Sequence, residues 1–395
     1  MTMAHARKSS RACENFFAGF VIFACGLSII ITTKSQTITR AKRKIDSSRE
    51  LQENRKTFLS VLNEEREKMD KSDAYRHPPI SDGNIDDTVV KGWFRRKPVD
   101  RYVPTTFHPI LTKPEIITSS VCKNTEVDIL VISVSYWGNA DKRAAIRGTW
   151  AARDTFIDIG TQVVFFLGRP TTAADQAKIE SEGQTYGDIV QGDFVDAKAN
   201  ISMKGLLALQ WINNNCLHAK YAIKADDDMF VNLFYVMEFG LSELSRQNKV
   251  IMCQTRPKNS IEIIRNKSSK WYVPPEVLPG RTKFPAMCYA NVVLLTMDVI
   301  PELYRASFSM PYCTVDDAYI FGMLVELAKD VEFQSIGETI SMDQNQAFED
   351  LLSPNQPQYL ASAVKQIEYF GKFWNTALKR VPRWAKVHLN KNIKT

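Results

Sequence analysis

Three consecutive carboxylates, Asp226, Asp227 and Asp228, are the residues of this sequence best suited to chemistry. Apolar segments flank them, so we expect them at the end of a buried strand, where neighbouring negative charges raise one another's pKa values. A divalent cation such as Mn²⁺ would relieve this repulsion and keep positions free for diphosphate oxygens. In an extended backbone alternate side chains point the same way, so Asp226 and Asp228 should face one ion and Asp227 should point elsewhere. The alternative is a solvated acidic turn that caps a following helix.

Two further pairs of residues could act on a phosphorylated ligand or its acceptor. Arg143 and Arg147 are four residues apart, so on a helix they share one face. A guanidinium group binds phosphate or carboxylate, so we expect both residues on the nucleotide, with a structural salt bridge as the open alternative. Asp316 and Asp317 open a predicted helix, whose N-terminal dipole favours ionised acids, so one of them can serve as a general base. Plain helix capping is the alternative for this pair.

The elements that must position these residues alternate between strands and helices. Buried-strand patterns cover 127–134, 163–167, 188–190 and 221–224, and helical patterns cover 141–150, 172–186, 202–216 and 319–329. This alternation predicts an α/β fold with a mostly parallel sheet and helices on both faces. Ligands of such sheets bind at the carboxyl ends of the strands, which is where the three consecutive carboxylates stand.

In chain order, five segments between about residues 126 and 331 resemble the motifs of glycosyltransferase family 31, the β1,3-galactosyltransferase and β1,3-N-acetylglucosaminyltransferase family. The most specific is KADDDMFVN (224–232), which is similar to the family's K-x-D-D-D-x-F-V-N. Asp316-Asp317 stands where the family has Glu-Asp. The remaining segments are RAAIRGTW (143–150), similar to R-x-x-I-R-x-T-W, FLG (166–168), similar to F-L-L-G, and DFVDAKANISMK (193–204), similar to D-F-x-D…N-L-T-x-K.

The resemblance implies a GT-A-like, Rossmann-like fold and an inverting transfer from a UDP-sugar. Asp226 and Asp228 would then hold Mn²⁺ on the UDP diphosphate, with Asp227 nearer the ribose and Lys224 also among the nucleotide-binding residues. Asp317 would deprotonate the acceptor hydroxyl. The expected product is a β1,3-linked glycan of a glycoprotein or glycolipid. Galactose is the expected donor sugar, and N-acetylglucosamine and N-acetylgalactosamine stay open because none of these motifs reads the sugar.

The sequence departs from the family pattern on the acceptor side. The family's Y-P-x-Y-x-x-G segment appears as FPAMCYA (284–290), with Ala290 in place of a glycine that would allow close backbone approach. An inactive homologue that binds glycans or assists a partner transferase is therefore the alternative function. A metal-dependent phosphohydrolase would need a second cluster of carboxylates and histidines, and the five scattered histidines do not predict one.

The N-terminal region predicts a membrane anchor. Residues 16–33, FFAGFVIFACGLSIIITT, follow a basic segment and as a helix would span roughly 27 Å, enough to cross a thin bilayer. A cleaved signal peptide is the alternative, and the positive charges after the run do not by themselves favour a cytoplasmic N-terminus. The layout resembles the family's single-pass type II topology in the Golgi membrane. We expect a cytoplasmic tail (1–15), a transmembrane signal-anchor (16–33), a stem (34–120) and a lumenal catalytic domain (121–395).

Two kinds of residue fit a lumenal location. Asn200 and Asn266 begin N-glycosylation sequons, and five cysteines follow the anchor, so at most two disulfides form and one thiol is buried or paired elsewhere. The sequence does not determine the pairing among Cys122, Cys216, Cys253, Cys288 and Cys313.

The overall composition is that of a globular protein, with 44% hydrophobic and 24% charged residues and a modest net charge of +7. No zinc-finger spacing or aromatic RNA-binding motif points to nucleic acid. A charged helical pattern at 50–70 leaves homo- or hetero-oligomerisation through the stem open.

Overall fold

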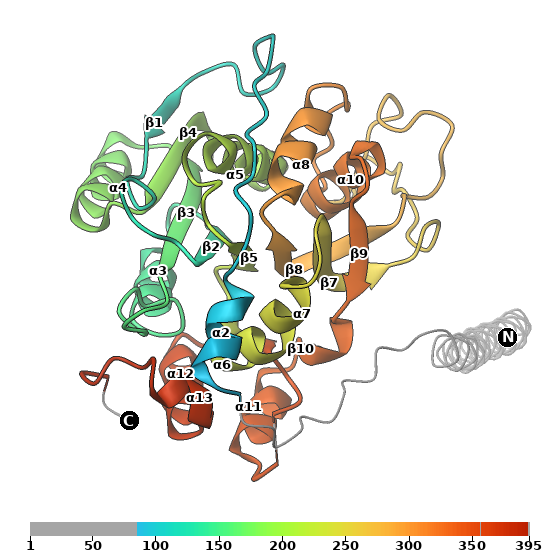
Figure 1. Ribbon diagram of the computed structural model, residues 1–395. Coiled ribbons are helices and arrows are strands. Elements are labelled where there is room, and N and C mark those ends of the chain that lie inside the picture. The colour runs from blue at the N-terminus through green and yellow to red at the C-terminus, as the bar shows by residue number, and fades with distance from the viewer. Residues whose placement is uncertain (1–84, 356, 394–395) are drawn as a thin grey trace, which may run out of the picture. The chain divides into compact units, whose positions relative to one another are not determined.

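In the computed structural model, which describes residues 85–355 and 357–393, a mixed eight-stranded sheet carries the site (Figure 1). A smaller sheet lies beside it, in the order β10 (Ile340–Ser341), β11 (Ala361–Ala363) and β6 (Met229–Val231). The strand order of the large sheet is β1 (Glu115–Ile117), β4 (Ile189–Val195), β3 (Thr161–Arg169), β2 (Ile129–Val134), β5 (Tyr221–Asp226), β8 (Met287–Thr296), β7 (Val250–Arg256) and β9 (Glu332–Ser335).

The centre of the large sheet is parallel, as the sequence predicted. Strands β4, β3, β2 and β5 pair in parallel, and β7 and β9 form a further parallel pair. Strand β8 is antiparallel to both of its neighbours, and β1 is antiparallel to β4. Strand β8 lies outside the four segments for which the sequence patterns predicted strands. In the register, Val134 at the end of β2 lies beside Asp226 at the end of β5.

Helices cover both faces of the sheet, which confirms the predicted layers (Figure 1). Alternate residues of β2 belong to separate clusters, with Ile129 and Val131 on one side and Leu130 and Ile132 on the other. On the Leu130 side lie α5 (Ile201–Asn215), α8 (Val299–Ser307), α9 (Asp316–Ala318), the π-helical turn η3 (Tyr319–Met323) and α10 (Leu324–Leu327).

The Ile129 side carries the remaining helices. An aromatic stack on this side joins Phe230 of β6 to Phe373, with ring centroids 4.9 Å apart. These helices are α2 (Asp87–Trp93), α3 (Ala140–Arg147), α4 (Ala173–Tyr186), α6 (Leu233–Tyr235), the π-helical turn η2 (Val236–Leu241), α7 (Ser242–Leu244), α11 (Gln344–Leu352), α12 (Glu368–Lys379) and α13 (Arg383–Lys386). Short 3₁₀ turns are η1 (Lys198–Asn200) and η4 (Gly337–Thr339).

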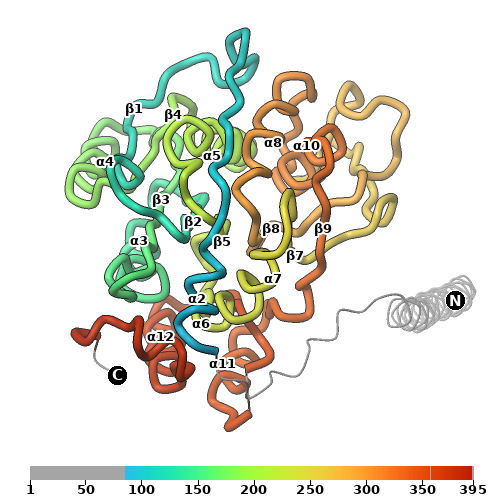
Figure 2. The backbone as a smooth tube through the Cα atoms, viewed as in Figure 1, coloured from blue at the N-terminus to red at the C-terminus, as the bar shows by residue number. Residues whose placement is uncertain are grey.

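The described part of the predicted stem, 85–120, packs against the rest of the described structure. Trp93 of α2 meets Trp384 of α13 edge-on, with ring centroids 5.4 Å apart. The Asn213 side chain on α5 holds the backbone of Tyr102 through two hydrogen bonds of 2.9 Å. Figure 2 shows the chain after α2 running along the body before it reaches β1. The predicted domain boundaries themselves stay predictions, and residues 1–84 lie outside the described part.

Two disulfides and one buried thiol account for the cysteines after residue 84. Cys122 bonds to Cys216 and Cys253 bonds to Cys288, and Cys313 is free and buried. This confirms the predicted limit of two bonds and supplies the pairing that the sequence left open. Within 85–355 and 357–393, none of the helices has the length and apolar character needed to span a bilayer. The predicted anchor at 16–33 lies outside these residues.

Candidate active site

The three consecutive carboxylates leave the sheet in a turn between β5 and β6. Asp227 and Asp228 form this turn, so the prediction of an extended backbone with alternating side chains is wrong. Asp227 is buried, Asp226 is partly exposed and Asp228 is exposed. The chain turns here because β6 does not continue in the large sheet but pairs with β11 in the smaller one. The carboxylates nevertheless lie at the carboxyl end of a buried strand, as predicted.

Asp227 is held by the loop that follows β2. Its Oδ2 accepts hydrogen bonds from Ser135 Oγ at 2.7 Å and Asn139 Nδ2 at 2.8 Å, and Lys142 Nζ lies 3.1 Å from Oδ1. Burial opposes ionisation of the carboxyl, but the two hydrogen bonds and the Lys142 charge outweigh it and lower the pKa of Asp227. Asp227 is therefore an ionised anchor for this loop, and its predicted contact with a ribose stays a prediction.

Asp226 belongs to a cluster of acids around the buried ammonium group of Lys224. Lys224 Nζ donates hydrogen bonds to Asp226 Oδ1 and to the backbone oxygen of Ala290. Burial raises the pKa of Asp226 to about 6; Lys224 opposes this shift, and the charges of Asp316 and Asp228 add to it. The side chain of Asp226 keeps 39% of its exposure, so a ligand can reach it.

Asp317 completes the cluster from the start of α9. Burial and the neighbouring charge of Asp316 raise the pKa of Asp317 to about 7, against the opposing effects of Lys224 and of a hydrogen bond from Ala290. The Ala290 nitrogen lies 3.2 Å from Asp317 Oδ1. A carboxyl with this pKa can accept a proton near neutral pH, which is what a general base requires.

Ala290 joins the two halves of this cluster through its backbone. It lies in a bulge of β8, where the pairing with β7 passes from Val293 directly to Tyr289. Its carbonyl accepts from Lys224 and its N–H donates to Asp317. Its φ is not positive, so the position does not need glycine. The methyl group is buried and lines an apolar cavity of about 40 Å³ beneath the site.

A buried ion pair positions the loop after β2, and the sequence patterns did not assign it a role. Lys204 Nζ lies 2.5 Å from Asp196 Oδ1 and donates to the backbone oxygen of Ser135 at 2.7 Å. Asp196 Oδ2 accepts from the backbone nitrogens of Trp137 at 3.0 Å and Gly168 at 3.1 Å. Both residues lie in the segment that resembles the family's D-F-x-D…N-L-T-x-K motif. That resemblance is the one feature of the sequence that could have indicated a role for them.

Gly168 is part of the same arrangement. A Cβ atom at this position would lie 2.8 Å from the Asp196 backbone nitrogen and Cα and 2.9 Å from the Phe194 oxygen. The ends of β3 and β4 can approach this closely only because residue 168 has no side chain.

Arg143 and Arg147 lie on one face of α3, as predicted, but both guanidinium groups are occupied by protein groups. Arg143 is fully buried and binds Glu182 at 2.7 and 2.8 Å and the Tyr136 oxygen at 2.8 Å. Arg147 makes two 2.8 Å hydrogen bonds to Asp188. The geometry favours the structural salt-bridge alternative, and Arg143 contributes to the site by supporting the loop after β2.

The two predicted sequons differ in their surroundings. Asn266 is exposed, and its Oδ1 accepts from the nitrogen and the hydroxyl of Ser268 at 3.0 and 2.9 Å. Asn200 precedes α5 and donates to the Val195 oxygen at 2.9 Å, and the hydroxyl-bearing Ser202 is buried. The exposed sequon is the better placed of the two for a glycan.

The fold and this cluster define a class of protein once they are compared with known sequences. Residues 141–335, from α3 to the end of β9, match a family model described as galactosyltransferase. This span contains the Asp226–Asp228 turn, Lys224 and Asp317. The class is therefore that of the glycosyltransferases.

Similarity to individual proteins narrows this class. Over 206 residues, the chain is 29% identical to beta-1,3-galactosyltransferase 5 of Pan troglodytes, a match that covers 52% of this chain and 67% of that protein. The corresponding protein of Homo sapiens is also 29% identical, with 64% of its length covered. Beta-1,3-galactosyltransferase 1 of Mus musculus is 27% identical over 237 residues, covering 58% of this chain and 67% of that protein. The chain belongs to glycosyltransferase family 31, and it spans about two-thirds of the length of these relatives.

Proposed function

We propose that this protein transfers a hexose, with galactose as the expected sugar, from a UDP-sugar to a glycan hydroxyl in a β1,3 linkage, with inversion at the anomeric carbon. The observation that carries this proposal is the acid cluster at the end of β5, in which Asp226 and Asp317 share Lys224 and have raised pKa values. The names of the related galactosyltransferases support the choice of sugar and linkage. The GT-A-like assignment of the fold is part of the same proposal.

The donor set of this cluster fits an oxygen-preferring cation such as Mn²⁺. Asp226 and Asp228 would hold it, since both carboxylates are accessible and the charge of Asp228 already raises the pKa of Asp226. When bound, the cation would stabilise negative charge on the departing UDP. Among the described residues, the acids here do not form a group of three with ligand atoms within 4.8 Å of one another, so diphosphate oxygens are needed to complete the shell.

Asp317 is the proposed general base. Its pKa of about 7 means that it can take the proton of an acceptor hydroxyl at neutral pH, and its hydrogen bond from Ala290 fixes the orientation of the carboxyl. Lys224 would offset the negative charge of the ionised carboxylates, since its Nζ already contacts Asp226 and the Ala290 carbonyl. Holding the donor and the acceptor in line supplies a further part of the acceleration.

The loop after β2 would hold the nucleotide beside Asp227. Four protein groups already fix this loop: Asp227 itself, the Lys204–Asp196 pair, and Arg143 through the Tyr136 carbonyl. The loop is thus rigid before any ligand arrives, which lowers the entropic cost of binding.

The cellular setting is proposed on the sequence features. A type II protein of the Golgi membrane, anchored by 16–33 with a lumenal catalytic region, fits the two disulfides and the exposed Asn266 sequon. The acceptor would be a glycan of a glycoprotein or glycolipid.

The inactive-homologue alternative rested on Ala290, and the structure weakens that argument. Ala290 is 2% exposed and lines a mostly apolar cavity, so its methyl group does not obstruct an acceptor at the surface. N-Acetylglucosamine and N-acetylgalactosamine stay the alternative donors.

A donor screen tests the proposal. The purified chain is incubated with Mn²⁺ and each of UDP-galactose, UDP-N-acetylglucosamine and UDP-N-acetylgalactosamine, and UDP release is measured with free sugars as acceptors. We expect one donor to be turned over, and Asp317→Asn to lower kcat by roughly 10²–10⁴-fold with donor affinity retained. Donor binding without turnover of any of the three would favour the inactive homologue.

A further inference from the structure

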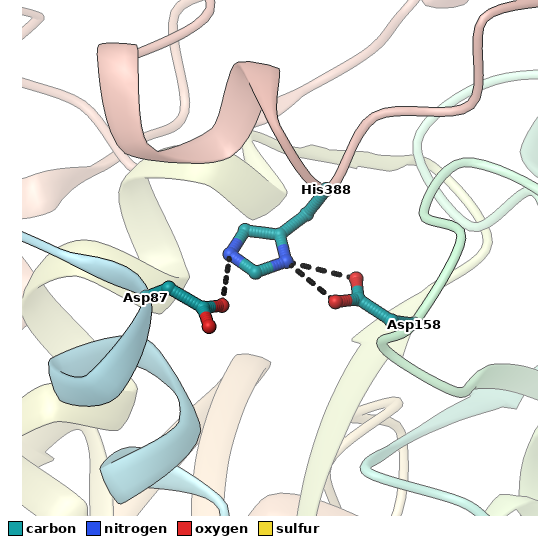
Figure 3. Close-up of side chains that lie close together, drawn as sticks. All are labelled: Asp87, Asp158 and His388. Carbon is teal, nitrogen blue, oxygen red and sulfur yellow. Dashed lines mark hydrogen bonds and ion pairs between the residues drawn. The ribbon is translucent and has the colours of Figure 1, made fainter.

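His388 lies between two carboxylates that come from distant parts of the chain (Figure 3). Asp87 is in the first turn of α2, Asp158 is in the loop between α3 and β3, and His388 follows α13. Within the described residues these three are the one group of His, Cys, Asp or Glu with ligand atoms within 4.8 Å of one another. The scattered histidines of the sequence predicted no such cluster, and that prediction is wrong at this place.

The hydrogen bonds of His388 determine which ring nitrogen is free. Nδ1 lies 2.8 and 2.9 Å from the two oxygens of Asp158, which assigns a proton to Nδ1. In the neutral imidazole Nε2 is then a lone-pair donor for a metal. Nε2 is buried, has no hydrogen-bond partner in the described structure, and points toward Asp87, whose Oδ1 is 3.6 Å away. The side chain of His388 is only 3% exposed, so an unpaired nitrogen here is costly.

We propose that this group binds a divalent cation of the zinc class, through His388 Nε2 and Asp87. Two ligand atoms bound to one tetrahedral Zn²⁺ are about 3.4 Å apart, close to the 3.6 Å separation of Nε2 and Asp87 Oδ1. Asp158 has the role of a carboxylate that orients a metal-binding histidine through its other nitrogen. Imidazole with carboxylate suits zinc better than Mg²⁺ or Ca²⁺, which prefer oxygen alone.

The surroundings leave room for the rest of the coordination shell. The side chains of Asp87 and Asp158 are 49% and 42% exposed, so water can supply the remaining ligands. The other oxygen of Asp87 pairs with Lys91 at 2.6 Å, which fixes the carboxylate without using Oδ1.

A cation at this place would fasten the C-terminal segment to the start of the folded unit. The Ile157 nitrogen donates to the His388 oxygen at 2.7 Å, and the Asn390 nitrogen donates to the Thr155 oxygen at 3.0 Å. These bonds tie the C-terminal segment to the α3–β3 loop, and the cation would add α2 through Asp87. The role is structural and does not depend on the proposed sugar transfer.

The test uses the full chain in an Asp228→Asn background, which removes a proposed Mn²⁺ ligand at the other site. After EDTA treatment and dialysis against micromolar ZnCl₂, the metal content is measured by mass spectrometry and the melting temperature by fluorescence. We expect about one Zn²⁺ per chain and a zinc-dependent rise in melting temperature. Both effects should be lost in His388→Gln. In Asp87→Asn, the affinity of the chain for Zn²⁺ should fall at least tenfold.

His218→Gln is the matched control, because His218 is an exposed histidine bonded to the Thr125 oxygen at 3.0 Å. It should keep the zinc and the shift in melting temperature. Asp87→Asn changes an exposed side chain, so it keeps the test valid should His388→Gln fail to fold. Equal zinc affinity of the background protein and of Asp87→Asn, measured over a series of ZnCl₂ concentrations, or no zinc in either, would overturn the proposal and leave the three residues as an ion-paired cluster.

Discussion

Breaking the buried Lys204–Asp196 pair should destabilise the protein and loosen the loop after β2. The two side chains are only 6% and 1% exposed, and Lys204→Met would leave Asp196 as an unpaired buried charge. Removing one partner of a buried pair costs about 3–5 kcal/mol, and here the 2.7 Å bond to the Ser135 oxygen is lost as well. We therefore expect a loss of about 4 kcal/mol in the free energy of unfolding.

Urea denaturation at neutral pH, followed by tryptophan fluorescence, measures this loss. The double variant Lys204→Met/Asp196→Asn should recover at least about 1 kcal/mol, because the amide removes the buried charge and its oxygen still accepts from the two backbone nitrogens. The matched control is Lys178→Met, since Lys178 pairs with Asp175 at 2.8 Å while its side chain is 76% exposed. That change should cost less than about 1 kcal/mol. If Lys204→Met costs no more than Lys178→Met, the ion pair does not hold this loop.

Three further outcomes are expected. In the metal-free protein Asp226 and Asp317 hold protons at higher pH than in the unfolded chain, so the free energy of unfolding should fall as pH rises from about 4 to about 7. The affinity for Mn²⁺ should rise over about pH 6–7, because the carboxylates lose their protons there. An affinity for Mn²⁺ that does not change across this range would contradict the assigned pKa values. Gly168→Ala should cost about 1–3 kcal/mol by denaturation, whereas Gly371→Ala, with nothing within 4 Å of the added carbon, should cost nothing. Expressed in a secretory pathway, Asn266→Gln should remove a glycan-sized increment of mass on a gel; an unchanged mass would show that this sequon is not used.

Much of the sheet and the position of the acid cluster could be predicted, because local patterns carry that information. Strand β2 is a β-branched apolar run, and Asp226 is the last residue of β5, so local sequence patterns were enough to predict the position of both. The turn at Asp227 could not be predicted, since it arises from the pairing of β6 with β11, whose residues lie more than 100 positions later.

The sequence also did not predict which groups the charged residues pair with. The spacing of Arg143 and Arg147 gave their shared helical face, but Glu182 and Asp188 reach them only through the packing of α3 against α4 and β4. Ala290 is a similar case, because its fit depends on a bulge in β8 that no local pattern indicates. The cluster around His388 joins residues 87, 158 and 388, so three-dimensional structure alone reveals it.

Calorimetric titration of UDP into the purified chain, with and without Mn²⁺, tests the central claim most directly. The acid cluster at the end of β5 should bind UDP with at least tenfold higher affinity when Mn²⁺ is present, and Asp228→Asn should abolish this gain while the melting temperature of the metal-free protein is unchanged. UDP binding of equal strength with and without Mn²⁺, or a gain that survives in Asp228→Asn, would contradict the assignment of these carboxylates as the metal and nucleotide site.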